Sequence, residues 1–432
     1  MRLINHLDPS QSRLGYLSCL ALVAGRQLDT RQGLIDRFCR FVFQQIDAHD
    51  PRWSEFMVLV DIAELERIKP QVDEKLAELS ELFRVKSDVG PSYTLHSLWL
   101  AQRRLTSHVG HLAKKDAVRI LEMARSFEIL TTGYALSEKG VFLQSFVSYV
   151  FPKAIDGAPQ CNPFAITERL SLQLFFLYAL LSVDILTPFL LRAFSESREG
   201  DLLIAPKLLG PAANALVAAV ERITDVSSIE AIREARSFAE RTENKSIARN
   251  QSRPRYHHLL ELQLLDRVEA DETGNRTVPY VANDACRRAA SVLMPLCERP
   301  DEQQDLIDRQ FFSWSAIIYD RTARPCADDT LRLLYFARGY EHLQREIGFT
   351  PGRTIALAGC LLALEEGWII EVAEMFDLMR RMAAGPWRPY LEYSGGSRLD
   401  QEFLIKIKPS LIPSLEDALR REAASTSGES NQ

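Results

Sequence analysis

The stretch RPRYHHLLELQLLDRVEADETGNRTVPYVANDACRRAA, from Arg253 to Ala290, decides how the middle of the chain is interpreted. Leucines recur at helical spacing through its first part, which predicts a helix. The turn formers Thr273–Asn275 then lie at the tip of a predicted two-stranded hairpin. A second helical run follows the hairpin, so the stretch predicts a helix, a hairpin and a helix in that order.

Two further helices are predicted just before this stretch, in AANALVAAVERI (Ala212–Ile223) and SSIEAIREARSFAERT (Ser227–Thr242). Between Lys245 and His258 the chain carries four cations and no acid. Three helices followed by a hairpin, with a leucine-rich turn just before the hairpin, resemble winged-helix DNA-binding domains. In that family the hairpin is the wing, and a helix follows it.

The resemblance implies that the third helix enters the major groove of double-stranded DNA with its N-terminal residues near the base edges. Cations before the helix and on the wing would contact the phosphate backbone or the minor groove. The DNA-contacting residues expected on this basis are Lys245, Arg249, Asn250, Arg253, Arg255, His257 and Arg276.

Two features of this region depart from a basic, base-reading module. Proline fits the first turn of a helix, and a start at Arg253 or Pro254 would leave the earlier cations in the preceding turn, as backbone contacts. The acids Glu269, Asp271 and Glu272 also crowd the predicted wing. Backbone contact or protein docking therefore stays open beside base reading.

A second region, HLAKKDAVRILEMARSFEILTTGYALSEKGVFLQSF (His111–Phe146), also resembles winged-helix regulators through its piece YALSEKG. Ser137 is expected to cap the helix that follows. The resemblance places Lys114, Lys115 and Arg119 on a helix that faces the DNA groove. A third unit, Asp328–Ile407, matches less well.

That third unit contains a predicted helix in GFTPGRTIALAGCLLALEEG. Thr350 is expected to cap it, Pro351 fits its first turn, and Gly367 fits just past its end. The glycines Gly395 and Gly396 predict a hairpin turn to which we assign no chemistry.

The composition limits the classes of function. The chain has 432 residues, 46% hydrophobic and 25% charged, and a net charge of −6. Binding to nucleic acid would therefore depend on local basic patches of an acidic protein. The cysteines are isolated, with no CxxC pair, so we expect buried thiols in a reducing cytoplasm, and no zinc ribbon or disulfide framework.

The apolar run Leu172–Phe194 is almost long enough to cross a bilayer. Asp184 lies in its middle, and Pro188 would break or kink a helix there. We therefore expect one buried helix or two short ones, and no membrane association.

Helical spacing dominates the rest of the chain, and strand-like runs are short. The sequence predicts a mainly α, multidomain protein with short β-hairpins, in which winged-helix units are embedded in a helical bundle. The expected segments are a helical region 1–90, a first winged-helix-like unit 91–160, a buried helical connector 161–210, a second winged-helix unit 211–300, a helical domain with a hairpin 301–416, and a disordered tail 417–432.

A weak internal echo links three of the predicted helices. Ile120–Met123, Leu259–Leu262 and Leu361–Leu364 each lie late in a helix, and a bulky apolar pair follows within several residues. The echo indicates one small unit used more than once, or chance among leucine-rich helices.

The leading function is non-catalytic DNA binding, by a transcription regulator or a DNA-contacting subunit of a DNA-processing or defence assembly. Protein partners or a homodimer are expected, and no cofactor. The alternative is a scaffold protein that uses winged helices for protein contacts. An enzyme such as a nuclease with an unrecognised site is a lower alternative, because no GxSxG, HExxH, GxGxxG or P-loop motif occurs.

Overall fold

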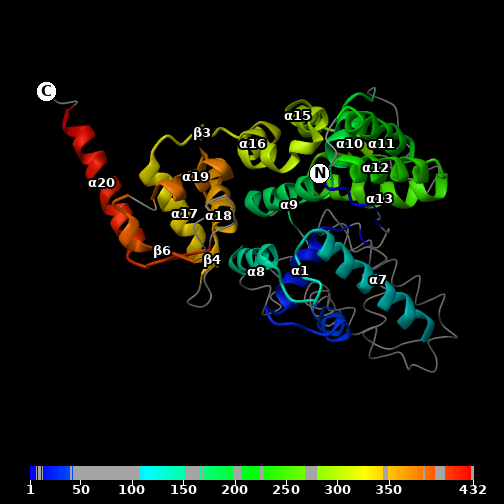
Figure 1. Ribbon diagram of the computed structural model, residues 1–432, viewed down its shortest axis with the longest axis horizontal. Helices are drawn as coiled ribbons and strands as arrows, with labels where there is room; N and C mark the ends of the chain where they lie inside the picture. The colour runs from blue at the N-terminus through cyan, green and yellow to red at the C-terminus, as the bar shows by residue number, and fades with distance from the viewer. Residues whose placement is uncertain are drawn as a thin grey trace. The chain divides into compact units, whose positions relative to one another are not determined.

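The computed structural model describes residues 1–5, 7, 11, 13–38, 41, 107–150, 166, 169–197, 206–223, 228–267, 280–343, 349–382, 385–394 and 404–429. These residues are mainly helical with a few short strands, as the sequence predicts (Figure 1). They belong to two compact units, Arg2–Asp284 and Ala285–Gln432, which we call the first and the second unit. The finer division into six segments stays a prediction.

The first unit is built from helices and one pair of short strands. Its elements are α1 (Gly15–Val23), α7 (Ser107–Ser126), α8 (Glu138–Val150), α9 (Leu170–Val183), α10 (Leu186–Ser195), α11 (Pro206–Val220), α12 (Ser228–Thr242), α13 (Lys245–Glu261), β1 (Leu265–Arg267) and β2 (Tyr280–Ala282). Helix α11 packs against α10, α12 and α13, and α1 packs against α7 and α8. Figure 1 shows α10 to α13 lying together. Strands β1 and β2 pair antiparallel, as expected for the hairpin.

The apolar run Leu172–Phe194 forms two helices, α9 and α10, that bend by 110° at the break between them. Asp184 and Ile185 occupy that break, and nearly every side chain of both helices is buried. Pro188 lies in the first turn of α10, where the missing N–H has no intrahelical partner to lose. Among the described residues no single helix is long and apolar enough to cross a bilayer; this bent pair passes that test only jointly, by length and composition.

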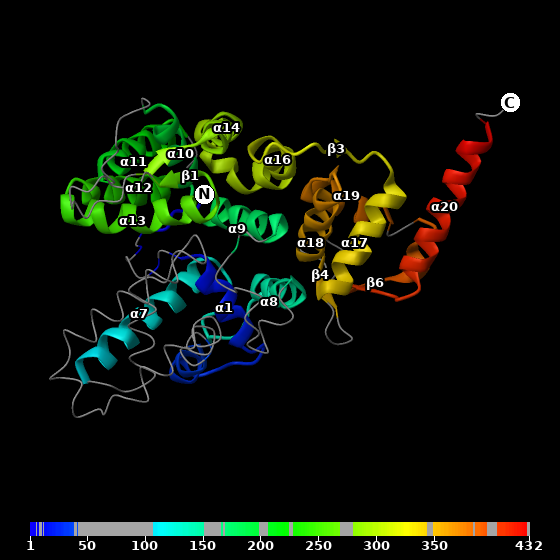
Figure 2. The same cartoon turned by 180° about the vertical axis from the view of Figure 1, so that it is seen from behind.

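The second unit combines helices with two small sheets (Figure 2). Its elements are α14 (Asp284–Val292, which begins at the last residue of the first unit), α15 (Met294–Glu298), η2 (Pro300–Glu302), α16 (Gln303–Ile318), β3 (Arg324–Pro325), α17 (Asp329–Leu343), β4 (Thr350–Pro351), α18 (Gly352–Glu365), β5 (Trp368–Ile369), α19 (Val372–Met382), η3 (Arg388–Tyr390), β6 (Leu391–Ser394), β7 (Leu404–Ile407) and α20 (Leu411–Glu429). β3 pairs with β5 in parallel, and β7 lies between β4 and β6 in an antiparallel sheet. The antiparallel β6–β7 pair matches the hairpin predicted from the sequence, whose turn at Gly395 and Gly396 lies outside the described residues.

Two glycines let α17 and α18 approach closely. A Cβ at Gly339 would lie 2.7 Å from the amide nitrogen of Gly359, and a Cβ at Gly359 would lie 2.7 Å from the carbonyl oxygen of Tyr335. Real Cβ atoms essentially never come this close to a backbone atom. The crossing of these helices therefore depends on glycine at both positions.

The internal echo corresponds to a shared way of ending a helix. Glu128 follows α7, Gln263 follows α13 and Gly367 follows α18, each as the second residue after the helix and each with positive φ. After α7, the amide of Ile129 donates to the carbonyl of Ala124, and the amide of Leu264 does the same to Leu259 after α13. This is the hydrogen-bond pattern of a Schellman motif. An apolar pair then leads each time into a strand or a β-bridge.

Two local predictions are wrong. Thr350 does not cap α18: it lies in β4, and Pro351 is the N-cap residue, without a side-chain cap. The tail after Glu416 is not disordered up to Glu429, because α20 continues to that residue. Ion pairs from Arg420 to Glu416 and Asp417 support this helix at spacings of four and three residues.

Candidate nucleic-acid interface

Helix α13 begins two turns earlier than Pro254 suggests. The side chain of Asn244 accepts hydrogen bonds from the amides of Ser246 (3.0 Å) and Ile247 (3.3 Å). This N-cap starts the helix at Lys245, and Pro254 lies inside it. The alternative start at Arg253 or Pro254 is therefore wrong, and the cations assigned to a preceding turn lie on the helix itself.

Three exposed cations follow one face of α13. Lys245, Arg249 and Arg253 are spaced by four residues, so each lies one turn beyond the last. None of the three makes an ion pair with another residue in the described part of the chain. Asn250 is also exposed beside them. We call Lys245, Arg249, Asn250 and Arg253 the basic face.

Arg255 is not part of this surface. Its side chain is 2% exposed, and its Nε atom lies 3.1 Å from Oδ2 of Asp184, which is fully buried. Its other nitrogens donate to the carbonyl of Ile4 and to Gln251. Arg255 is therefore a core residue, and its expected contact with DNA is wrong, because the guanidinium faces inward.

The other predicted residues lie in different surroundings. His257 is half-buried, with its ring 5.8 Å from that of Tyr280 on β2. Arg119 is half-buried on α7, and its carbonyl accepts from the side chain of Gln11. Lys114 and Lys115 also lie on α7, but their side chains, like Arg276 and the wing acids, are outside the described residues.

The side of α13 turned away from the basic face is polar and buried. Gln251 donates to the carbonyl of Leu7 and accepts from its amide, both at 2.9 Å. Glu261 accepts from Nε of Arg13 at 3.1 Å and from the amide of Leu14 at 2.5 Å. These side chains hold residues near the start of the sequence against the helix.

His258 makes a third contact of this kind. Its Nε2 atom lies 2.8 Å from the carbonyl oxygen of Gln11. Because a carbonyl can only accept, Nε2 must carry the proton, and Nδ1 is buried without a hydrogen-bond partner among the described residues. Burial lowers the pKa of His258 to about 4, so the ring is neutral at pH 7.

Burial also changes the acids on this side of α13. It raises the pKa of Glu261 to about 6, although Arg13 opposes the rise. It raises the pKa of Asp184 as well, and here the guanidinium of Arg255 opposes the rise. Both acids are therefore held by a partner cation at a place where a lone carboxylate would be costly.

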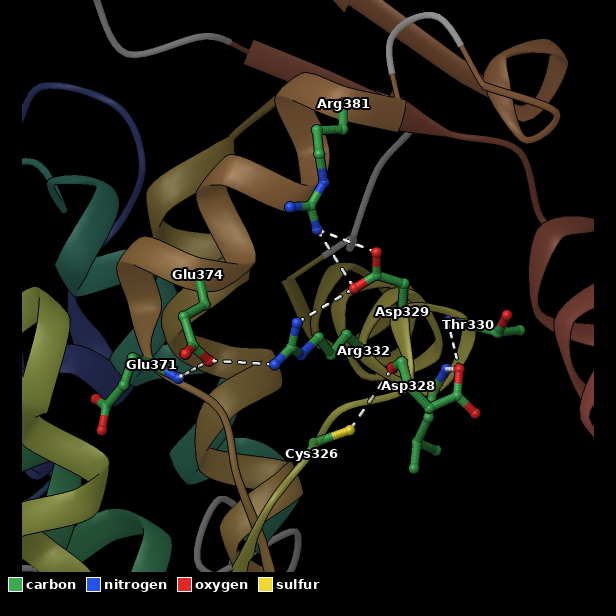
Figure 3. A network of polar contacts seen from close by, with 9 residues as sticks. Cys326, Asp328, Asp329, Thr330, Arg332, Glu371, Glu374 and Arg381 are labelled. Atoms are coloured by element: carbon green, nitrogen blue, oxygen red, sulfur yellow. Dashed lines mark hydrogen bonds and ion pairs between the residues drawn. The ribbon is translucent and has the colours of Figure 1, made fainter.

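A second cluster of charged side chains joins α17 to α19 in the second unit (Figure 3). Arg332 lies 3.2 Å from Asp329 and 3.6 Å from Glu374, and Arg381 reaches Asp329 at 3.1 Å. Asp328 caps α17 by accepting from the amides of Thr330 and Leu331. Every charge drawn in this cluster has a partner, so we assign it a structural role.

A pocket of about 540 Å³ lies nearby, lined by α16, the start of α18 and α19. Its arginines are already paired: Arg353 with Asp308, Arg309 with Asp305 and Arg380 with Asp377. Each arginine of the pocket therefore already has an acidic partner, and we assign the pocket no ligand. Within the described ranges, no group of three or more His, Cys, Asp or Glu side chains could hold a metal ion.

The described cysteines are all buried: Cys19, Cys286, Cys297, Cys326 and Cys360. Burial raises the pKa of Cys286 to about 12 and the pKa of Cys19 well above its usual value. These two thiols are therefore protonated at neutral pH and are poor nucleophiles.

The buried polar residues of α13 were not predicted as a group. Gln251, Arg255 and His258 follow one another at spacings of four and three residues, which is the signal of one helix face. The signal is weak because polar residues at helical spacing usually indicate a solvated surface.

Comparison with protein-family models, curated proteins and solved structures finds no match to this chain.

Proposed function

We propose that this protein binds double-stranded DNA without catalysis, through the basic face of α13. The observation that carries the proposal is the row Lys245, Arg249 and Arg253, exposed at successive turns and free of acidic partners among the described residues. Between Lys245 and Leu260 the helix carries no acid at all. Such a row matches a chain of phosphates better than a mixed-charge protein surface.

The surrounding elements support a winged-helix interpretation of this region. Helix α12 ends at Thr242 and α13 begins at Lys245, so a two-residue turn separates them. Helices α11, α12 and α13 pack on one another, and the β1–β2 pair follows α13 directly. In helix-turn-helix proteins the second helix of such a pair lies in the major groove. We propose that role for α13, with β1 and β2 as the base of the wing.

The chemistry of the basic face favours backbone contact over base reading. Lys245 to Arg253 spans about 12 Å of helix at 1.5 Å per residue. Over that length only Asn250 offers an exposed side-chain amide that can pair with an adenine edge, because the amide of Gln251 is buried against Leu7. We therefore expect binding that depends strongly on salt and weakly on sequence.

Helix α7 is the proposed second contact, through Lys114, Lys115 and Arg119. Gln11 links the two helices: its side chain donates to Arg119 on α7, and its carbonyl accepts from His258 on α13. Phe127 also packs edge-on against His258, with ring centroids 6.1 Å apart. A transcription regulator or a cytoplasmic DNA-processing or defence assembly would suit such a protein.

Charge reversal tests this proposal. We expect Arg249→Glu and Arg253→Glu each to weaken binding to a random-sequence duplex by tenfold or more, because a contact is replaced by a repulsion. Arg421→Glu on α20 is the matched control, since Arg421 is also exposed and the charge change is the same. Equal affinities for all three variants and the original protein would rule out the basic face as the contact.

The alternative is a scaffold that docks other proteins, with a homodimer as one case. Ile229 on α12 is 56% exposed and Ile247 on α13 is 38% exposed, which suits an apolar contact. Ile247→Asp separates the two functions. Loss of a partner or of self-association with unchanged DNA affinity would favour the scaffold.

A further inference from the structure

The described residues between Arg2 and Leu14 are held mainly by their main chain. The carbonyl of Ile4 accepts from Arg255, the amide and carbonyl of Leu7 bond to Gln251, and the carbonyl of Gln11 accepts from His258. The amide of Leu14 donates to Glu261. We call the described residues between Arg2 and Leu14 the strap.

The strap is also anchored at the break between α9 and α10. The amide of Ile185 donates to the carbonyl of Arg2 at 2.9 Å. Oδ1 of Asp184 accepts from the amide of Ile4 at 3.3 Å, while Oδ2 of the same carboxylate binds Arg255. Asp184 therefore joins the strap, the α9–α10 break and α13 at one point.

The residues that grip the strap form one side of α13. Gln251, Arg255, His258 and Glu261 are spaced by four, three and three residues. Lys245, Arg249 and Arg253 lie on the opposite side, because each residue turns the helix by about 100°. Any rotation of α13 that moved the basic face would break these contacts.

Apolar packing alone would leave the rotation of α13 about its own axis poorly defined. Five of its nine buried residues are polar or charged: Gln251, Ser252, Arg255, His258 and Glu261. Hydrophobic burial is non-directional, whereas hydrogen bonds to fixed carbonyls and amides require a defined geometry. The polar contacts with the strap therefore set the orientation of this helix.

We propose that the strap fixes the orientation of α13, and that Gln251, Arg255 and Glu261 are positioning residues for the basic face. This inference rests on the proposed DNA-binding function for its effect on affinity. The effect of the strap on the orientation of α13 is independent of that function. The strap acts by holding a helix, and none of its gripping residues contacts DNA.

The test combines hydrogen exchange of the α13 amides with DNA affinity at several salt concentrations. In Gln251→Ala we expect exchange across Lys245–Glu261 to quicken by at least about threefold to tenfold, the range for losing one buried hydrogen bond, because Gln251 makes two of them to Leu7. DNA affinity should fall by a similar factor, with an unchanged dependence on salt because no phosphate contact is lost. Ser252→Ala is the matched control: Ser252 is buried next to Gln251, and among the described residues its hydroxyl bonds only to the carbonyl of Arg249 within the helix.

A variant in the strap tests whether the effect of Gln251→Ala comes only from a change within α13 itself. Arg13→Met keeps most of the side-chain volume but removes the partner of Glu261, and it should reproduce both effects. Unchanged exchange in both variants would overturn the strap. Faster exchange with unaltered DNA affinity would overturn the positioning role. If the original protein binds no DNA, the proposed function fails, while the exchange experiment still decides whether the strap holds α13.

Discussion

Asp184 and Arg255 form an ion pair inside the first unit, 71 residues apart in sequence and 3.1 Å apart between Oδ2 and Nε. Asp184 interrupts a run of apolar residues, and Arg255 lies beside the exposed cations of α13. Each has an ordinary explanation when taken alone, as a helix breaker and as a DNA contact. Together they join the α9–α10 break to α13, and both side chains are buried.

Removing one partner of this pair should be costly. Asp184→Ala leaves the Arg255 guanidinium buried without its counter-ion, which typically costs about 3–5 kcal/mol of the free energy of unfolding. Urea unfolding of the original protein and the variant measures the loss. The control is Glu196→Ala, which breaks the exposed pair with Arg192 and should cost less than about 0.5 kcal/mol. Similar losses in both variants would show that Asp184 does not carry a buried pair.

Acid should weaken the first unit through His258. Its pKa is about 4 in the folded protein, below the ordinary 6.5, so the unfolded chain binds more protons between these values. The stability that comes from keeping the ring neutral is therefore present above about pH 6.5 and is lost as the pH falls toward 4. The total loss is about 3 kcal/mol at most.

The change His258→Gln isolates this effect, because a glutamine amide can still donate to Gln11 but does not titrate. Glu261 titrates in the opposite sense, and it does so in both proteins, so it cancels in the difference. We expect the advantage of the original protein over His258→Gln to shrink between pH 6.5 and pH 4.5. A difference that stays constant with pH would contradict the burial of a neutral ring.

The crossing of α17 and α18 should not accept a methyl group. Gly359→Ala places a Cβ 2.7 Å from the carbonyl of Tyr335, and we expect a loss of about 1–3 kcal/mol. Gly210 provides the control, since it lies inside α11 and a new Cβ there would meet no other part of the described protein within 4 Å, apart from its chain neighbours and the backbone of its own helix. Gly210→Ala should change the stability by less than about 1 kcal/mol, because the helix preference of alanine is opposed by the restriction that the following Pro211 places on a residue with a Cβ. Thermal unfolding of both variants distinguishes these outcomes.

Local signals predicted much of this fold. The mainly helical class, the strand pair after α13 and the strand pair before α20 follow from periodicity and turn residues. Ser137 bonds to the amide of Gly140 at the start of α8, as its position predicts. The apolar run breaks at Asp184, as its charge predicts, whereas Pro188 lies in the first turn of the helix that follows. Each of these features is decided by residues close together in the chain.

The features that the sequence did not reveal depend on distant contacts. Arg255 meets Ile4 across 251 residues, and Arg13 meets Glu261 across 248. No local pattern distinguishes an arginine that reaches such a partner from one that faces water. The start of α13 was predicted too late for another reason. Proline usually lies in the first turn of a helix, but here Asn244 caps the helix and Pro254 lies inside it. Lys245, Arg249, Asn250 and Arg253 are therefore exposed, as a surface contact requires, whereas Arg255 is not.

We propose that the basic face of α13 binds the DNA backbone. The most direct measurement is the slope of log affinity against log salt concentration, for the original protein and for Lys245→Ala/Arg249→Ala/Arg253→Ala together. Each lost phosphate contact should reduce the slope by about 0.9, so we predict a total reduction of about two to three in the triple variant. Equal slopes for the two proteins, or no binding by the original protein at low salt, would contradict the claim.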